Sequence, residues 1–111
     1  MIELDTEQGT DVAVVRPQGR LTMVHAADLR AVVTDALADG RTRVVVDLGG
    51  CEFMDSSGLG AVIGGLKAAR QAGGDLRIAA LQPQVMTVLQ LTNLDRVLRP
   101  YGSVAEALRG D

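Results

Sequence analysis

Apolar positions recur along the chain with two periods, one typical of strands and the other of helices. Residues 12–15 form an apolar run that predicts a strand, and residues 2–4 are a weaker strand candidate before it. Gln8-Gly9 lies between the two and favours a hairpin turn. Because Pro17 has no N–H to donate to a sheet, we expect the second strand to end or bend there.

After Gly19 the apolar positions recur every three or four residues, which predicts a helix that Gly40 ends. Residues 43–48, RVVVDL, form a β-branched run without polar alternation until Asp47. Such a run predicts a central strand covered on both faces.

The second half continues this alternation. Apolar residues from Leu59 to Ala69 predict a second helix that Gly73-Gly74 ends. We then expect a strand over residues 76–80 and a third helix with Pro83 in its first turn. A short strand follows around residues 97–98, and Pro100 closes it. Ser103 and Glu106 have the spacing of a capping box and predict a last helix through Leu108.

Strands that alternate with helices predict a parallel arrangement, so the fold class is α/β. At 111 residues, of which 47% are apolar, the chain has the size of one ordinary domain, and we expect residues 1–111 to form it. The sequence has one Phe, one Tyr and no Trp, which predicts an aliphatic core.

The composition of the chain argues against several classes of function. A net charge of −3 with interspersed signs, and little aromatic surface, argue against nucleic-acid binding. One cysteine excludes an internal disulfide and favours a reducing compartment. No apolar stretch approaches the roughly 18 residues of a membrane span, and the acidic amino terminus does not resemble a signal peptide. We therefore expect a cytoplasmic protein without a membrane partner.

The segment FMDSSGLG, residues 53–60, is the candidate for chemistry. A serine between a strand and a helix suggests the nucleophile elbow of a hydrolase, but that motif needs a glycine two residues before the nucleophile. Met54 and Asp55 occupy those positions for Ser56 and Ser57, and the only histidine, His25, lies upstream. This spacing argues against an enzyme.

Cofactor sites are no better supported. The glycines at 58, 60, 64 and 65 do not have dinucleotide-binding spacing and instead predict close approach of the second helix to the sheet. His25 and Cys51 are too far apart in sequence to suggest a metal site. We expect His25 to be a surface or capping residue of the first helix and Cys51 to be a small buried hydrophobic residue.

Asp55, Ser56 and Ser57 permit two interpretations from the residues alone. Asp and Ser are favoured caps of a helix N-terminus, because their oxygens accept from backbone N–H groups that the first turn leaves unpaired. A phosphate at the same place would be stabilised by free N–H donors and the positive end of the helix dipole. A helix cap and a phosphorylation site both remain open.

This segment, directly after a VVVDL-type strand, resembles the STAS domains of bacterial anti-sigma factor antagonists, whose hallmark is a D-S-S-G motif that opens the second helix. The similarity extends to the amino-terminal hairpin, Gly19-Arg20-Leu21, the Gly73-Gly74 turn and residues 94–97. It implies a single STAS-like domain with a mixed, mainly parallel sheet of about five strands and about four helices.

The resemblance also implies a function. Ser56 would accept a phosphoryl group from a serine kinase that is also the anti-sigma factor. The unphosphorylated chain would bind that kinase and release a sigma factor, and a protein phosphatase would restore binding. The protein would be a substrate without a cofactor. Its expected partner-binding residues are Gly19, Thr22, Met23, Asp55, Ser56, Ser57, Gly58 and Leu59.

One position departs from the family pattern. Family members commonly carry an acid shortly after the glycine that ends the second strand, whereas this chain has the neutral Thr22. Thr22 would cap the first helix or serve as a second phosphate acceptor. The departure also leaves open an alternative function, a STAS scaffold or interaction module that is never phosphorylated.

Overall fold

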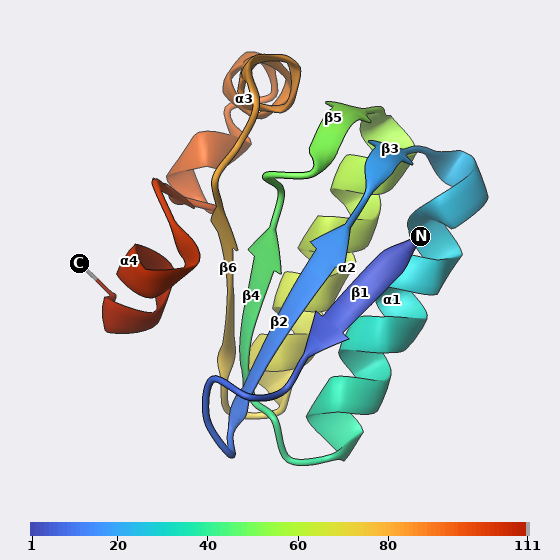
Figure 1. The fold of residues 1–111 in the computed structure, drawn as a ribbon. Helices are drawn as coiled ribbons and strands as arrows, with labels where there is room; N and C mark the ends of the chain where they lie inside the picture. The colour runs from blue at the N-terminus through green and yellow to red at the C-terminus, as the bar shows by residue number, and fades with distance from the viewer. Residues whose placement is uncertain (111) are drawn as a thin grey trace.

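The valine run forms the middle strand of the main sheet in the computed structural model, which describes residues 1–110 (Figure 1). This strand is β4 (Arg43–Asp47), and the five strands of the sheet have the order β1-β2-β4-β6-β7. β1 (Ile2–Asp5) pairs antiparallel with β2 (Val12–Pro17). β6 (Asp75–Ala79) and β7 (Pro100–Tyr101) continue the sheet in parallel. The predicted mixed, mainly parallel sheet is confirmed.

Helices cover both faces of this sheet. α1 (Met23–Ala38) and α2 (Ser56–Gln71) lie side by side on one face, and the short α4 (Val104–Arg109) packs on the other (Figure 1). Val44 and Val46 belong to the large cluster beneath α1 and α2, whereas Val45 belongs to the smaller cluster with α4. Burial on both faces explains why β4 has no polar alternation.

The predicted ends of elements agree with the structure in several places. Gly40 and Gly73, just past α1 and α2, have φ angles of +84° and +83°, which favour glycine. α3 (Pro83–Leu91) begins at its proline. The Ser103 hydroxyl accepts from the Glu106 N–H at 3.1 Å, as the capping box predicts.

A second, two-stranded sheet was not predicted. It consists of β3 (Gly19–Leu21) and β5 (Cys51–Met54), which pair in parallel. These strands continue β2 and β4 after an interruption in each strand, at Gln18, directly after Pro17, and at Leu48-Gly49-Gly50 (Figure 1). β3 has only three residues and β5 lacks β-branched residues, so neither has a recognisable strand pattern.

The expected strand around residues 97–98 is wrong. Residues Leu94–Arg96 form a 3₁₀ helix, η1, and the strand β7 begins at Pro100, the residue expected to close it. Leu98 is apolar because it is buried in the large core cluster, not because it lies in a strand. β7 is an edge strand, where a residue without an N–H is tolerated.

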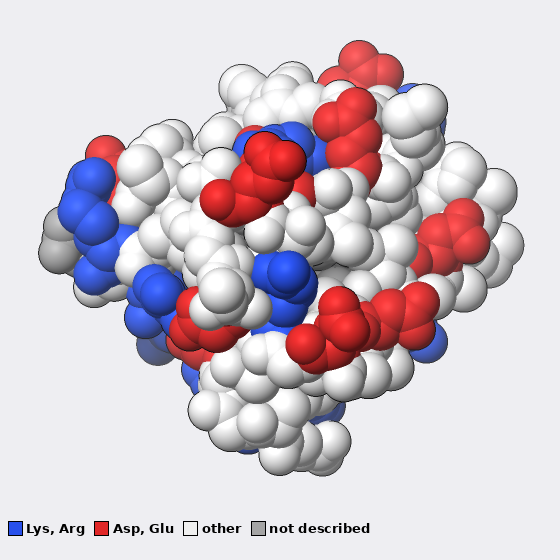
Figure 2. Space-filling model, turned by 60° about the horizontal axis from the view of Figure 1, so that its bottom comes forward, with Lys and Arg blue, Asp and Glu red and all other residues white. Residues whose placement is uncertain are grey.

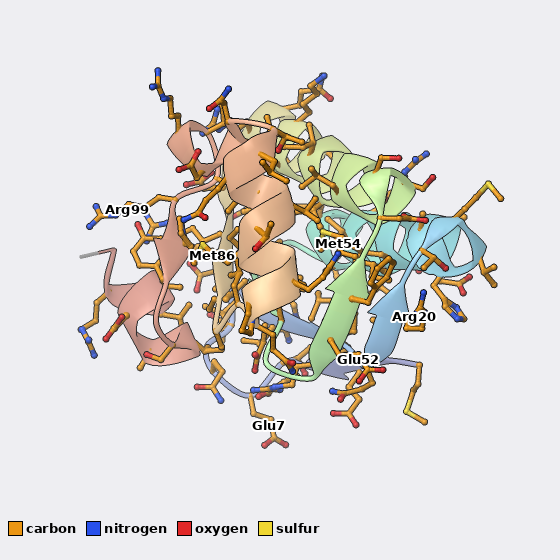
Figure 3. The ribbon with its side chains drawn as sticks, turned by 90° about the horizontal axis from the view of Figure 1, so that it is seen from above. Glu7, Arg20, Glu52, Met54, Met86 and Arg99 are labelled. Atoms are coloured by element: carbon orange, nitrogen blue, oxygen red, sulfur yellow. The ribbon has the colours of Figure 1, made fainter. Side chains whose placement is uncertain are left out.

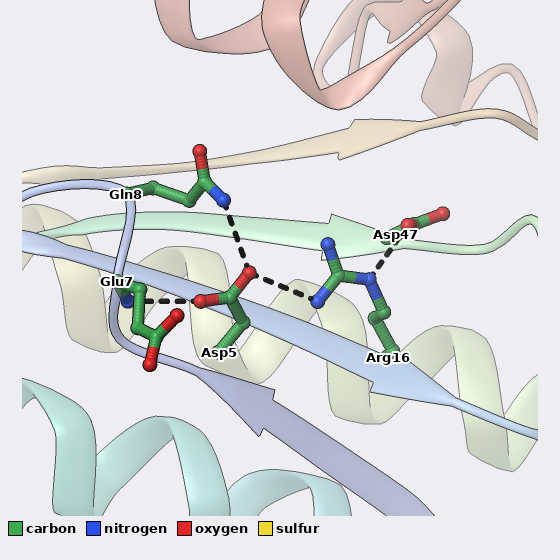
Figure 4. A network of polar contacts seen from close by, with 5 residues as sticks. All are labelled: Asp5, Glu7, Gln8, Arg16 and Asp47. Atoms are coloured by element: carbon green, nitrogen blue, oxygen red, sulfur yellow. Dashed lines mark hydrogen bonds and ion pairs between the residues drawn. The ribbon is translucent and has the colours of Figure 1, made fainter.

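A polar network ties three strands together on the face that carries α4 (Figure 4). The Arg16 guanidinium contacts Asp5 at 3.2 Å and Asp47 at 3.1 Å, and thereby links β1, β2 and β4. Asp5 also accepts from the Glu7 N–H and the Gln8 amide. These bonds, with Arg16, hold the pKa of the Asp5 carboxyl below its ordinary value of 3.8.

This lowered pKa predicts a small acid-dependent loss of stability. The contribution is fully present above the unfolded pKa of about 4 and is lost as the pH falls through the lower, folded value. Asp5→Asn should therefore reduce the drop in melting temperature between about pH 5 and about pH 3. Thermal melts followed by circular dichroism test this. Glu3→Gln, which removes a carboxyl from the same strand, is the matched control, and an equal reduction in that variant would contradict the assignment.

Candidate functional site

The serines lie where β5 ends and α2 begins, at the end of the molecule that also carries β3 and the start of α1 (Figure 3). Met54, the last residue of β5, is buried, and Arg20 and Glu52 lie on the outer side of the two strands (Figure 3). The bend after β2 and β4 thus carries the D-S-S-G motif beyond the end of the main sheet.

The Asp55 carboxylate serves the first turns of two helices. Its Oδ1 accepts from the Gly58 N–H at 2.8 Å, so Asp55 is the cap of α2. Its Oδ2 accepts from the Met23 N–H, the first residue of α1, at 3.3 Å. Because unpaired N–H groups at a helix start must find acceptors, this one side chain joins α1 to α2.

Thr22 is placed as expected but acts differently. It occupies the cap position of α1, yet its hydroxyl makes no capping hydrogen bond. The Asp55 carboxylate, 32 residues further along, supplies the acceptor instead. The expectation that the Thr22 hydroxyl caps the first helix is therefore wrong.

Ser56 is exposed and Ser57 is half-buried. Among the hydrogen bonds of residues 1–110, none involves either hydroxyl, and none uses the N–H groups of Ser56 and Ser57. Since Asp55 caps α2, the serines are not needed as caps. Their hydroxyls and N–H groups are available for other contacts.

Gly58 lets β3 pass directly over the start of α2. A Cβ at this position would collide with the Leu21 carbonyl oxygen, whereas a Cβ at Gly60 would meet open space. Gly65 lies against Leu76 of β6 and Val33 of α1. The expected close approach of α2 is therefore confirmed at Gly58 and Gly65 and is wrong for Gly60 and for Gly64, whose nearest neighbour is the Arg30 side chain.

A side chain that sequence reasoning missed holds β5 from the other side. The Gln84 amide, on α3, donates to the Met54 carbonyl at 3.1 Å and accepts from the Met54 N–H at 2.8 Å. It replaces a neighbouring strand at this point. A glutamine in the first turn of a helix carries no pattern that could reveal such a contact.

The surface beside Ser56 is apolar. Met23 and Val24, in the first turn of α1, are 74% and 75% exposed. Of the other expected binding residues, Gly19 and Thr22 are half-buried, while Gly58 is buried and Leu59 is only 7% exposed. Leu59 and Gly58 therefore support the surface from inside and do not form part of it.

Polar side chains lie on the same two elements as this apolar surface, α1 and β3. The Arg20 guanidinium lies 4.2 Å from the centre of the Phe53 ring, on the outer side of the two-stranded sheet. His25, partly exposed in the first turn of α1, is 3.7 Å from Asp28. The surface near Ser56 therefore combines exposed apolar side chains with a stacked cation.

Cys51 lies beneath the site and is fully buried, as expected. Its thiol donates to the Phe53 carbonyl oxygen at 3.4 Å. Burial raises the pKa of this thiol. The thiol is therefore a packing group of the core.

Within residues 1–110, no cluster of three or more histidine, cysteine or acidic side chains is arranged to hold a metal ion. None of the helices in that range has both the length and the apolar character needed to cross a membrane.

A known protein family matches almost the whole chain. Residues 3–107 match the model of the STAS domain. The chain belongs to the STAS domain family. The anti-sigma F factor antagonist of Paenibacillus polymyxa is 29% identical over 109 residues, which cover 96% of this chain and 92% of that protein.

Solved STAS structures agree with this fold. The crystal structure of an anti-sigma factor antagonist from Mycobacterium paratuberculosis has a TM-score of 0.83 and 27% identity, and covers 99% of this chain and 93% of that one. The Bacillus cell fate determinant SpoIIAA in its phosphorylated form has a TM-score of 0.75 and 24% identity, over 98% and 97% of the two chains. At that identity, the likeness to SpoIIAA shows the fold alone.

The double role of Asp55 predicts a large difference between two adjacent alanine variants of this STAS domain. Asp55→Ala should lower the free energy of unfolding by about 1–2 kcal/mol, because both helix starts lose an acceptor. Ser56→Ala should change it by less than about 0.5 kcal/mol, because the hydroxyl has no partner. Urea denaturation of both variants measures the difference, and equal losses would contradict the role assigned to Asp55.

The glycines of α2 predict effects of opposite sign. Gly58→Ala should destabilise the domain by about 2–3 kcal/mol, because the new methyl group collides with the Leu21 backbone. Gly60→Ala should stabilise it by about 0.5–1 kcal/mol, because alanine is the better helix former and the site is open. Thermal and urea melts would contradict this packing if both variants shifted in the same direction.

Proposed function

We propose that this STAS domain is a cytoplasmic anti-sigma factor antagonist switched by phosphorylation of Ser56. In the unphosphorylated state it binds a serine-kinase anti-sigma factor through the exposed side chains of residues 19–24 and 55–60, with Gly58 and Leu59 beneath this surface, and the sigma factor is released. The kinase then transfers a phosphoryl group to Ser56, which ends the complex. A protein phosphatase removes the phosphate. The chain is a substrate in this cycle and not an enzyme.

The observation that carries the proposal is that Asp55, and not Ser56, caps α2. A serine that capped its own helix would bury its hydroxyl in a hydrogen bond, and phosphorylation would cost that bond. Here the Ser56 hydroxyl is exposed on an ordered helix start. A docking kinase therefore reaches it without unfolding any element.

Two further observations support partner binding at this place. Met23 and Val24 expose large apolar side chains beside the serine, as the core of a protein interface requires. Relatives across the family carry the description of anti-sigma factor antagonist, among them the Paenibacillus protein and the anti-sigma-B factor antagonist of Staphylococcus aureus, 31% identical over 72% of this chain.

The switch follows from charge. A phosphoserine adds about −1.5 to −2 charges at neutral pH. The unused N–H groups of Ser56 and Ser57 and the dipole of α2 stabilise this charge within the domain. An interface that accommodates a neutral hydroxyl beside apolar side chains does not stabilise this charge. A loss of about 3 kcal/mol of binding free energy weakens binding by about a hundredfold. The domain stays folded in both states.

Phosphate transfer to defined serine variants tests the proposal. The domain is incubated with ATP, magnesium and a purified serine-kinase anti-sigma factor from the same organism, and the phosphate is located by mass spectrometry. Ser56→Ala should lose labelling and keep kinase affinity. Ser57→Ala, the matched control, should keep both. Ser56→Asp should bind the kinase at least about tenfold more weakly, with an unchanged melting curve.

The alternative function, a STAS scaffold without phosphorylation, is favoured by the neutral Thr22 and uses the same surface. It predicts that Ser56→Asp binds its partner as well as the parent does and that no serine is labelled. Thr22→Val tests whether the Thr22 hydroxyl is a second phosphate acceptor. If Ser56 is the acceptor, this variant should be phosphorylated to the same extent as the parent. Labelling at Thr22 in place of Ser56 would overturn the proposed switch.

A further inference from the structure

A hollow of about 110 Å³ lies at the edge of the sheet, beside the first half of β6. β7 pairs only with Ile78 and Ala79, so residues 75–77 have no neighbouring strand on that side. The C-terminal turn of α2 and residues 97–99 border the gap. Its polar lining consists of Arg70, Asp75, Arg77, Arg99 and Tyr101.

The charges in this hollow do not balance. Three guanidinium groups, of Arg70, Arg77 and Arg99, line it together with one carboxylate, that of Asp75. In Figure 2, Lys and Arg side chains are more frequent at the left, and Asp and Glu side chains are more frequent in the middle and at the right, so the two signs are unevenly distributed on this face. The chain as a whole carries a net charge of −3, so the charge of this hollow is opposite in sign to that of the whole chain.

Asp75 shows that the hollow accepts an oxyanion. Its carboxylate lies 3.6 Å from Nε of Arg70 and 3.6 Å from Nε of Arg77, and it accepts from the Leu76 N–H at 3.0 Å. One carboxylate neutralises one guanidinium. Two positive charges remain for a second anion beside it.

Arg77 is held in place by a hydrogen bond, whereas the donors of Arg99 are unused in residues 1–110. Nη1 of Arg77 donates to the Ala107 carbonyl at 2.6 Å, which anchors its guanidinium against α4. The centre of the Tyr101 ring lies 5.6 Å from Cζ of Arg77 and 5.5 Å from Cζ of Arg99, so both guanidinium groups contact the same ring. In residues 1–110, no hydrogen bond or ion pair involves the Arg99 guanidinium. Its planar donors match a phosphate oxyanion.

We propose that this hollow binds the phosphate group of a small molecule. One water molecule needs about 10–15 Å³ of such space, so the hollow, with about 110 Å³, has room for one tetrahedral oxyanion and the atom that carries it. Arg99 and Arg70 bind the phosphate oxygens, Arg77 supplies a fixed positive charge, and Leu76 and Leu98 line the floor. Inorganic phosphate and a phosphomonoester share this chemistry. The proposal does not depend on the function proposed for Ser56.

Nuclear magnetic resonance titration of the ¹⁵N-labelled chain tests the site. Inorganic phosphate and phenyl phosphate are added in separate titrations at constant ionic strength. Both should shift the amide signals of residues 75–77 and 97–101 in a saturable manner. Tighter binding of phenyl phosphate would identify an organic phosphomonoester as the ligand, and equal binding would identify free phosphate.

Three variants make the test specific. Arg99→Gln should weaken binding by about fivefold or more, because it removes charge-assisted hydrogen bonds. Asp75→Asn, which keeps the acceptor for the Leu76 N–H, should tighten binding by removing the competing charge. Arg30→Gln makes the same charge change on an exposed position of α1 and should have no effect. Equal weakening by Arg30→Gln, or no saturable shift at residues 75–77, would overturn the proposal.

Discussion

One carboxylate determines how the amino-terminal ends of the two long helices meet. Asp55 accepts from Gly58 of its own helix and from Met23 of α1, so the starts of α1 and α2 share an acceptor. The fold depends strongly on this shared acceptor. Unpaired N–H groups at a helix start cost free energy, and here a single side chain accepts from the N–H groups of both helices. The same arrangement releases Ser56 from capping and leaves an exposed hydroxyl beside apolar side chains.

The bend in the β2 and β4 pair places this carboxylate. β2 ends at Pro17 and β4 ends before Gly49-Gly50, and the two segments pair again as β3 and β5. The bend separates β5 from β6, and the Gln84 amide takes the place of a strand beside Met54. Backbone hydrogen bonds thus hold the serine segment on one side and a side chain holds it on the other, which keeps an exposed site on a fixed frame.

Patterns within ten or so residues could be predicted, and contacts between distant segments could not. Residues 43–48 predict a strand buried on both faces because three valines follow one another, and the capping box at Ser103 depends on two residues three apart. The bond from Met23 to Asp55 spans 32 residues and needs the bend first. Leu98 was misassigned because burial in a core and membership of a strand select the same residue types.

The buried cysteine has a practical consequence for measurements on this domain. Cys51 is inaccessible to solvent, and the same burial raises the pKa of its thiol, which further disfavours the reactive thiolate. Maleimide dyes and spin labels would therefore leave it unmodified in the folded protein. A cysteine introduced at an exposed position would be labelled selectively, so distance and mobility probes can be attached without first replacing the native residue.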